Sequence, residues 1–274
     1  MAHPGAARSG TLISGDALSL PTSARVFSYL ASGKGSYNDD RQVAESLVAH
    51  WPGIMHQVKD QPIARQLLWN LVTDHASQVV DLGCGLAGAV SVDDPMPTTL
   101  HAQNQYRHKS MAHTLYIDKD LEVLAQARAW WEWPALVAGH RVGVLDLDLT
   151  DSDWVMAALE LRFDLSAPVG VVATLTLAHL DDGQFQRLAQ ALADRLAPGS
   201  VFALTHLSAP ADVEIGAVYN ERVADYGGHS QLVDRTGEQV QELLHRSGWP
   251  RFHYYADNTF SHQSGLIAAF AEKG

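Results

Sequence analysis

The pattern of apolar and polar positions divides the chain into a helical first part and an alternating second part. Residues 1–20 are rich in Gly, Ala and Ser and lack periodicity, so we expect a flexible tail there. Three segments of helical periodicity follow. They are a helix capped by Ser23 that ends before Gly33, a run over roughly residues 40–51 and a run over roughly residues 62–74.

Beyond residue 76, short apolar runs alternate with helical segments, which is typical of a mainly parallel sheet with helices on its faces. The clearest helix runs from about Asp182 to Leu196, and Thr236 begins a capping-box sequence for a later helix. The last two expected strands should pair as a terminal antiparallel hairpin. The sequence therefore predicts an α/β fold with a seven-stranded sheet. The expected strands cover residues 78–82, 114–117, 141–145, 169–175, 201–205, 252–256 and 266–270.

Composition and charge narrow the class of protein. The 274 residues are 46% hydrophobic and 18% charged, which suits one globular domain with a helical accessory part. The formal net charge of −12 would repel a phosphate backbone, so nucleic acid is not an expected partner. Cys84 is the single cysteine, which favours a reducing compartment. We see no signal-peptide or membrane-spanning stretch and expect a cytoplasmic protein with no membrane partner.

A glycine turn, Asp81-Leu82-Gly83-Cys84-Gly85, follows the first expected strand. In a doubly wound sheet, ligands bind beyond the carboxyl ends of the strands, and glycines there let a ligand approach the main chain. Acidic residues follow the next two strands. Asp118 could accept hydrogen bonds from both hydroxyls of a ribose, and Asp148 could receive an adenine amino group. These positions predict a cofactor that contains a nucleoside.

The same turn also matches the dinucleotide fingerprint, because Gly83, Gly85 and Gly88 have its spacing. Two features count against a dinucleotide. The charge of Asp81 disfavours a pyrophosphate but suits the cationic amino group of S-adenosylmethionine. Asp118 lies 30 residues beyond Gly88, whereas the fingerprint expects an acidic residue after about 20. Taken singly, each acidic residue could also cap a turn or a helix.

The N-terminal motif carries a family resemblance that extends from about Pro21 to the C-terminus. Ala24-Arg25-Val26-Phe27-Ser28-Tyr29-Leu30 and its continuation, residues 33–41, resemble a pattern of S-adenosyl methyltransferases best known from actinomycete genomes, a family long catalogued as a domain of unknown function. The chain departs from that pattern at Ser32 and Ser36 and in what looks like an insertion, residues 86–95. Further matches are Tyr116-Ile117-Asp118-Lys119-Asp120, Ala178-His179, Leu196-Ala197-Pro198-Gly199-Ser200 and Arg235-Thr236.

The resemblance implies a class I, Rossmann-like methyltransferase domain with helices on both faces of its sheet (residues 76–274) and an N-terminal helical lid (residues 21–75). It implies S-adenosyl-L-methionine as cofactor and S-adenosyl-L-homocysteine as product. Gly33 and Lys119 fall within the matching motifs and Leu149 follows Asp148, so these three residues join the predicted cofactor site.

Lid residues complete that predicted site. Arg25 and Lys34 could pair with the methionine carboxylate, and Tyr29 or Tyr37 could form an aromatic wall near the sulfonium. In the alternative interpretation, Tyr29 belongs to the lid core and Lys34 is solvated.

Two histidines are candidates for a catalytic base. Methyl transfer is an in-line displacement, and an acceptor that loses a proton is helped by a general base. His179 follows the fourth strand and precedes Asp181 and Asp182, which could orient it or raise its pKa. His206, after the fifth strand, is the second candidate. His179 could equally be a packed structural histidine.

Two other clusters carry no specific signal. The histidines at 101, 108 and 113 lie near two aspartates, but the spacings match no metal-ligand pattern, so no metal is expected. Trp130, Trp131 and Trp133 are expected to pack a helix end.

The sequence therefore predicts an S-adenosylmethionine-dependent methyltransferase with a small-molecule acceptor, for which we favour a natural-product intermediate of secondary metabolism. Two alternatives stay open: a regulatory protein that binds the cofactor without transferring methyl groups, and an enzyme that uses the sulfonium to promote a rearrangement or cyclisation. A NAD-dependent oxidoreductase fits less well. The oligomeric state is left open, with a homodimer as one option.

Overall fold

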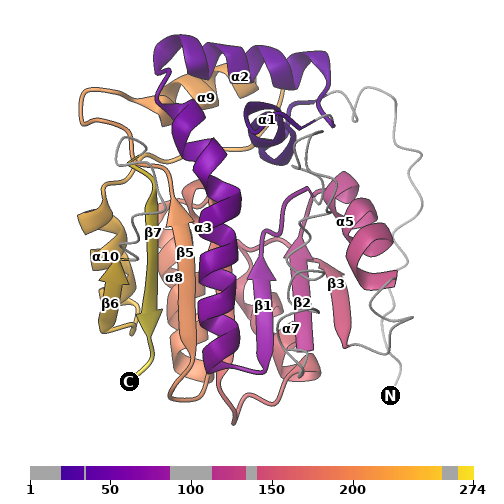
Figure 1. Ribbon diagram of the computed structural model, residues 1–274, viewed down its shortest axis with the longest axis vertical. Coiled ribbons are helices and arrows are strands. Elements are labelled where there is room, and N and C mark those ends of the chain that lie inside the picture. Colours follow the sequence, from indigo (N-terminus) through magenta and orange to yellow (C-terminus); the bar gives the residue numbers. More distant parts are fainter. Residues whose placement is uncertain (1–19, 34, 87–112, 134–140, 255–264) are drawn as a thin grey trace.

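The computed structural model describes residues 20–33, 35–86, 113–133, 141–254 and 265–274. The predicted tail up to residue 19, Lys34 and all of the expected insertion except Leu86 lie outside the described residues. The last two residues of the strand expected at 252–256 also lie outside them. Figure 1 shows the described part as a central sheet with a group of helices above one edge.

A seven-stranded sheet has the order β3-β2-β1-β4-β5-β7-β6. The first five strands of the chain are parallel, whereas β7 runs antiparallel between β5 and β6. The mainly parallel sheet and the terminal antiparallel pair both confirm the sequence prediction. The strands are β1 (Gln78–Leu82), β2 (His113–Asp118), β3 (Val142–Asp146), β4 (Val169–Thr174), β5 (Val201–His206), β6 (Arg251–Tyr254) and β7 (Ile267–Glu272).

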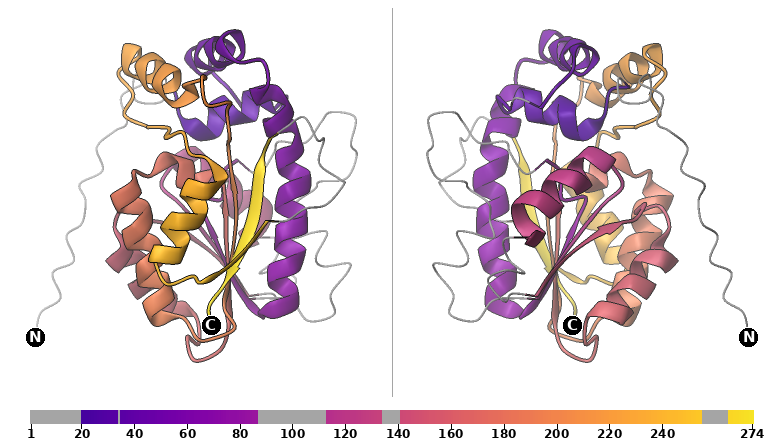
Figure 2. Two further views of the ribbon diagram at one scale, coloured as in Figure 1. Left: turned by 90° about the vertical axis from the view of Figure 1, so that its left-hand side faces the viewer. Right: turned by 90° about the vertical axis from the view of Figure 1, so that its right-hand side faces the viewer.

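Helices cover both faces of the sheet, as the two side views in Figure 2 show. Every residue of β1 is buried, and the neighbours Val79 and Val80 belong to hydrophobic clusters on opposite faces. This two-sided burial is typical of parallel strands between helices. One face carries α3 (Ile54–His75), α5 (Leu121–Ala127) and the short π-helix η2 (Arg128–Glu132). The other carries α7 (Ser152–Arg162), α8 (Asp182–Arg195) and α10 (Gly237–Arg246).

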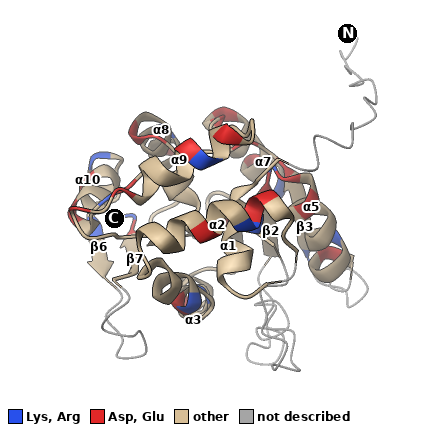
Figure 3. Cartoon of the chain, turned by 90° about the horizontal axis from the view of Figure 1, so that it is seen from above, with Lys and Arg blue, Asp and Glu red and all other residues tan. Residues whose placement is uncertain are grey.

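A cap of helices lies above the carboxyl ends of the parallel strands (Figure 1). It consists of α1 (Ser23–Leu30), α2 (Asn38–His50), α9 (Ile215–Asp225) and the first turns of α3. Seen from above in Figure 3, acidic and basic residues are interspersed on the cap helices. The sequence predicted the first two helices but missed α9, whose early Gly216 weakens the helical signal. The cap is therefore built from two distant parts of the chain.

Helix α3 begins earlier than the sequence predicted. The prediction covered roughly residues 62–74, whereas the helix begins at Ile54 and holds Pro62 in its interior. Val58, before the proline, is buried in the cap cluster, and Leu68 and Val72, after it, are buried against the sheet. Burial at both ends outweighs the hydrogen bond that Pro62 cannot donate. A single helix thus belongs to both the cap and the sheet layer.

Helix starts differ from the prediction in detail. Thr22, rather than Ser23, caps α1 by accepting a hydrogen bond from a backbone N–H group. The capping box predicted at Thr236 is confirmed at the start of α10, and Asp181 caps α8. All three caps use short polar side chains, as helix N-termini prefer.

Acidic residues other than those singled out from the sequence cap the helices after β2 and β3. Asp120 accepts a backbone hydrogen bond of 2.9 Å at the start of α5, and Asp151 accepts one of 3.2 Å at the start of α7. Asp118 and Asp148 are therefore not the caps of these helices, whereas the alternative that they cap turns fits the backbone N–H groups that their carboxylates accept.

The three clustered tryptophans behave differently from one another. Trp131 is 4% exposed and its ring centroid lies 4.5 Å from that of Tyr116, whereas Trp130 and Trp133 are 63% and 69% exposed. The expected packing of a helix end was right for Trp131 and wrong for the other two.

Within the described ranges, no helix combines the length and apolar character that crossing a membrane requires.

Candidate functional site

A cavity of about 1150 Å³ lies between the cap and the carboxyl edge of the sheet. Its wall draws on α1 and α3, on the turns that follow β1, β2, β3 and β4, and on the loop at residues 228–230. Clefts at this edge of a doubly wound sheet are the usual ligand sites of such folds. The cavity is therefore the candidate functional site.

The glycine turn after β1 forms part of the cavity wall. Gly83 and Gly85 have φ values of +66° and +67°, in the region that side chains rarely adopt. A Cβ atom on Gly83 would also lie 2.5 Å from the side chain of Thr176. Thr176 donates its hydroxyl to the carbonyl oxygen of Leu82 at 2.7 Å, which holds the turn against the segment after β4. The predicted turn therefore exists, and both glycines line the cavity.

Asp118 lies at the end of β2 and also lines the cavity. Its Oδ2 accepts the N–H of Gly85 at 3.0 Å, and its Oδ1 accepts those of Lys119 and Asp120 at 2.8 and 3.0 Å. Burial raises the pKa of Asp118, and the three backbone N–H groups oppose that rise. The carboxylate is thus fixed by neutral donors.

Asp148, Lys119 and Leu149 lie beside it on the cavity wall. Asp148 accepts the N–H of Thr150 at 3.0 Å and the ammonium of Lys119 at 3.2 Å. Burial would raise the pKa of Asp148, but the hydrogen bonds from Thr150 and the charge of Lys119 outweigh it and lower the pKa. The structure therefore brings together the residues predicted after β2 and β3.

Asp81 lies beneath the wall rather than on it. It is fully buried, and its Oδ2 accepts a hydrogen bond of 2.5 Å from the guanidinium of Arg65 on α3. Arg65 does line the cavity. The sequence reasoning missed it. A usable signal was its place between Ala64 and Leu68, both buried against the sheet, since a charged residue there must have a partner.

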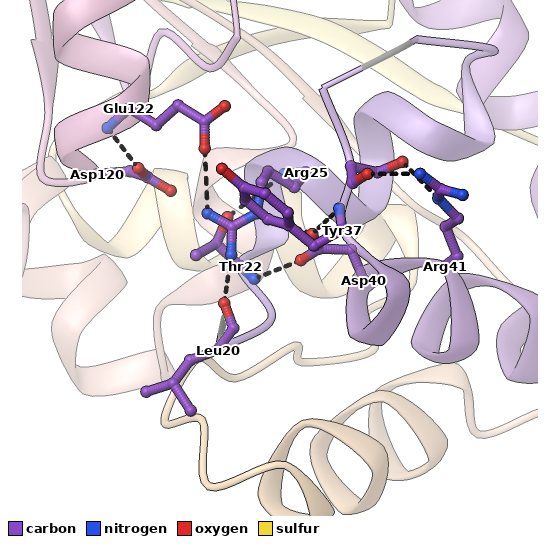
Figure 4. A network of polar contacts seen from close by, with 9 residues as sticks. Leu20, Thr22, Arg25, Tyr37, Asp40, Arg41, Asp120 and Glu122 are labelled. Atoms are coloured by element: carbon purple, nitrogen blue, oxygen red, sulfur yellow. Dashed lines mark hydrogen bonds and ion pairs between the residues drawn. The ribbon is translucent and has the colours of Figure 1, made fainter. Parts of the chain in front are cut away.

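Arg25 on α1 reaches the cavity wall with its charge already satisfied (Figure 4). Its Nε donates to buried Asp40 at 2.8 Å, and its Nη1 donates to Glu122 of α5 at 3.3 Å. Its Nη2 donates to the carbonyl oxygen of Leu20. Tyr37 stacks over the guanidinium, 5.0 Å from its carbon to the ring centroid. The predicted partner of a carboxylate is thus engaged by the protein's own groups.

The other described lid residues that were predicted for the cofactor, Tyr29, Gly33 and Tyr37, are not among those that line the cavity. The hydroxyl of Tyr29 donates to Glu45, and Tyr37 is 46% exposed. A Cβ atom on Gly33 would lie 2.2 Å from the hydroxyl of Ser28, so packing within the lid explains this glycine. Lys34 lies outside the described residues. The structure therefore gives the predicted aromatic wall no support from these tyrosines.

His179 lines the cavity at the end of a strained turn. The turn begins at Leu175, which has a φ of +60°, a costly conformation that is common at functional sites. The Nδ1 of His179 lies 2.6 Å from the carbonyl oxygen of Gln231. Burial lowers its pKa to about 4. The predicted rise from its acidic neighbours is wrong, because Asp181 caps α8 and Asp182 pairs with Arg235.

His206 is fully buried and is not among the cavity-lining residues. Its Nδ1 lies 2.7 Å from the carbonyl oxygen of Leu207, and its Nε2 lies 3.4 Å from Arg235. Burial lowers its pKa to about 4 as well. Its position thus supports packing rather than contact with a ligand in this cavity.

Of the histidines considered as metal ligands, His113 lies in β2, and those at 101 and 108 lie outside the described residues.

Comparisons with known proteins agree on the fold. A model of the family described as S-adenosyl methyltransferase matches residues 16–248. A DUF574 family protein from Streptomyces avermitilis has a TM-score of 0.74 at 20% identity, over 93% of this chain and 98% of its own. A candidate methyltransferase from Thermobifida fusca has a TM-score of 0.72 at 22% identity, over 97% and 99%.

A more distant similarity extends to an enzyme with its cofactor bound. Human N-acetylserotonin methyltransferase in complex with SAM has a TM-score of 0.50 at 15% identity, over 85% of this chain and 57% of its own. No functionally curated protein matches the chain.

Proposed function

Because the chain belongs to the S-adenosyl methyltransferase family, we propose that it transfers a methyl group from S-adenosylmethionine to a small molecule bound beneath the cap. The cavity carries the proposal. Its volume of about 1150 Å³ exceeds the range of roughly 300–1,000 Å³ that is typical of sites for one small molecule. It therefore has room for a cofactor and an acceptor. We retain a natural-product intermediate as the acceptor class, because apolar side chains such as Phe27, Val58 and Leu180 share the wall with polar groups.

The nucleoside end of the cofactor is assigned to the side of β2 and β3. Oδ1 of Asp118 already accepts two backbone hydrogen bonds, whereas Oδ2 accepts one and keeps a lone pair for a ribose hydroxyl. Asp148 and Leu149 line the same cavity, and we assign the adenine to them. Gly85 has no Cβ atom, and nothing lies within 4 Å of the position that one would take, so a ligand can approach the main chain there. This arrangement fits the cofactor of the family.

His179 is assigned to the acceptor. When bound, the cofactor supplies an electrophilic methyl group on a sulfonium sulfur. A carbonyl oxygen only accepts hydrogen bonds, so Nδ1 of His179 carries the proton that it shares with Gln231 and Nε2 is left to accept one from the acceptor. With a pKa of about 4, the ring is neutral at pH 7. The neutral ring therefore accepts a hydrogen bond that orients the acceptor, and it takes the proton of an acceptor hydroxyl, which becomes strongly acidic as the methyl group is transferred.

The proposal is tested by calorimetry with S-adenosylmethionine, S-adenosylhomocysteine and NAD, followed by turnover assays on small hydroxylated and aminated acceptors. Mass spectrometry of copurified molecules would supply the first acceptors to assay. We expect binding of both sulfur compounds and none of NAD. Tighter binding of NAD would overturn the proposal.

His179→Ala separates the catalytic assignment from cofactor binding. We expect kcat to fall about 10²- to 10⁴-fold if the histidine assists proton transfer, with the affinity for S-adenosylmethionine unchanged. Cofactor binding without turnover on any acceptor would instead indicate the regulatory alternative, and conversion of a molecule without methyl transfer would indicate a rearrangement.

A further inference from the structure

Arg65 lines the cavity, and within the described residues its guanidinium makes one hydrogen bond, from Nη2 to Asp81, so that Nη1 is left without a bond. The two side chains are 19% and 0% exposed. Within the described part of the chain, Nε of Arg65 and Oδ1 of Asp81 are buried without a hydrogen-bond partner. A guanidinium has five N–H donors, and a buried donor without a hydrogen bond destabilises the protein. A cation in this state, on the wall of a cavity, is suited to an anionic ligand group.

The other described cations on the cavity wall are less suited to that task. Arg25 is bonded to Asp40, Glu122 and a main-chain carbonyl group, and Lys119 is paired with Asp148. Lys59 is exposed and lies six residues before Arg65 on α3, about 9 Å nearer the cap along the helix axis. Arg65 is therefore the cation that combines a cavity position, burial and unused donors.

The strand order says which part of the cofactor reaches Arg65. Asp148 follows β3 and Asp118 ends β2, and β1 is the next strand in the sheet. A ligand whose adenine lies at Asp148 and whose ribose lies at Asp118 continues across the glycine turn of β1. Arg65 lies close enough to that turn for its charge to act on Cys84, which is part of the turn. Burial raises the pKa of the Cys84 thiol, and the charge of Arg65 opposes the rise. The group beyond the ribose in this cofactor is the amino-acid end, with its α-carboxylate.

We propose that Arg65 binds the α-carboxylate of the cofactor and that Asp81 is a positioning residue that holds the guanidinium against β1. This inference rests on the proposed function. The same guanidinium lies over the ring of Trp131, with 5.9 Å between the guanidinium carbon and the ring centroid. The sequence assigned the carboxylate to Arg25 and Lys34, whereas the contacts of Arg65 assign it to helix α3, which joins the cap to the sheet.

The experiment compares ligands with and without the carboxylate. Calorimetry would measure S-adenosylhomocysteine, its decarboxylated analogue and 5′-methylthioadenosine, which lacks the whole amino-acid end. For Arg65→Met we expect the affinity for S-adenosylhomocysteine to fall about 10- to 100-fold, with the affinities for the other two ligands unchanged. Arg65→Lys should retain part of the affinity. Lys59→Met is the matched control and should bind all three ligands as the wild type does.

Each other outcome has a distinct meaning. Equal losses for all three ligands in Arg65→Met would overturn the inference, because they would show a structural role for Arg65. Loss of S-adenosylhomocysteine affinity in Lys59→Met alone would move the carboxylate to Lys59. If the wild type bound none of the ligands, the proposed function itself would fail.

A second measurement does not depend on a folded variant. In the wild-type protein, removal of the carboxylate from the ligand should weaken binding about 10- to 100-fold at low salt. Equal affinity for S-adenosylhomocysteine and its decarboxylated analogue would also overturn the inference.

For Asp81→Asn, the preference for the carboxylate should fall while 5′-methylthioadenosine binds as before. An unchanged preference would remove Asp81 as a positioning residue.

Discussion

The cap and the carboxyl edge of the sheet hold their charged side chains in different ways. In the cap, buried Asp40 accepts hydrogen bonds from Arg25 and from the N–H groups of Thr22 and Tyr37 (Figure 4). At the sheet edge, Asp118 is held by three backbone N–H groups. The first carboxylate is neutralised within the protein, whereas the second keeps its charge for a partner. Position on a cavity wall is therefore a poorer guide to ligand binding than the partners a charged group already has.

The largest expected effect is on the cap. Arg25→Met would leave the Asp40 carboxylate buried without its cation, which should lower the free energy of unfolding by about 3 to 5 kcal/mol. Urea denaturation would measure it. Tyr29→Phe, which removes one exposed hydrogen bond of α1, is the control and should change stability by about 0.5 kcal/mol or less. If Arg25→Met kept its stability but bound the cofactor weakly, Arg25 would serve ligand binding rather than the stability of the cap.

At the sheet edge, His206 is expected to make the free energy of unfolding depend on pH by about 3 kcal/mol. His206 has an ordinary pKa of 6.5 when unfolded, and burial lowers it to about 4 in the folded protein. The unfolded chain thus binds the proton first, so stability falls as the pH falls from 6.5 to 4. His206→Gln should reduce this fall by about 3 kcal/mol in urea titrations at pH 7 and pH 4. Equal pH dependence in both proteins would show that the histidine is not held neutral by burial.

A smaller effect, on binding rather than stability, is expected at β2. Asp118→Asn should weaken S-adenosylhomocysteine binding about 10- to 100-fold, because a charged acceptor of a ribose hydroxyl is lost. Asp146→Asn, at an exposed position that ends β3 and is not among the cavity-lining residues, is the control. Calorimetry would measure both. If Asp118→Asn destabilised the fold and left the affinity intact, Asp118 would serve the stability of the protein, as Asp40 does in the cap.

The smallest effect is expected at Lys119. Its ion pair with Asp148 is 64% and 46% exposed on the two side chains. Exposed pairs contribute about 1 kcal/mol or less, so Lys119→Ala should change cofactor affinity by less than about fivefold. A larger loss in the same calorimetric series would show that this lysine contacts the ligand.

The sheet could be predicted from the sequence because its strands are short apolar runs whose burial is a local property. The glycine turn, Asp118 and Asp148 could be placed for the same reason, since each lies at the end of a strand or within two residues of it. The partners of Arg25 could not be predicted, because Asp40 and Glu122 lie 15 and 97 residues away in the chain. Arg65 was missed because its role depends on the packing of α3 over β1.

Helix α3 also bears on how this protein could be divided. The sequence suggested a boundary at residue 75 between a lid and a catalytic domain, but Leu68, Trp69 and Val72 of α3 are part of the sheet's hydrophobic cluster. A fragment that begins at residue 76 would therefore uncover an apolar sheet face and lose the Arg65 side chain. Exchange of lids between relatives should use junctions on the N-terminal side of Pro62, so that the graft replaces the cap and keeps the half of the helix that belongs to the sheet.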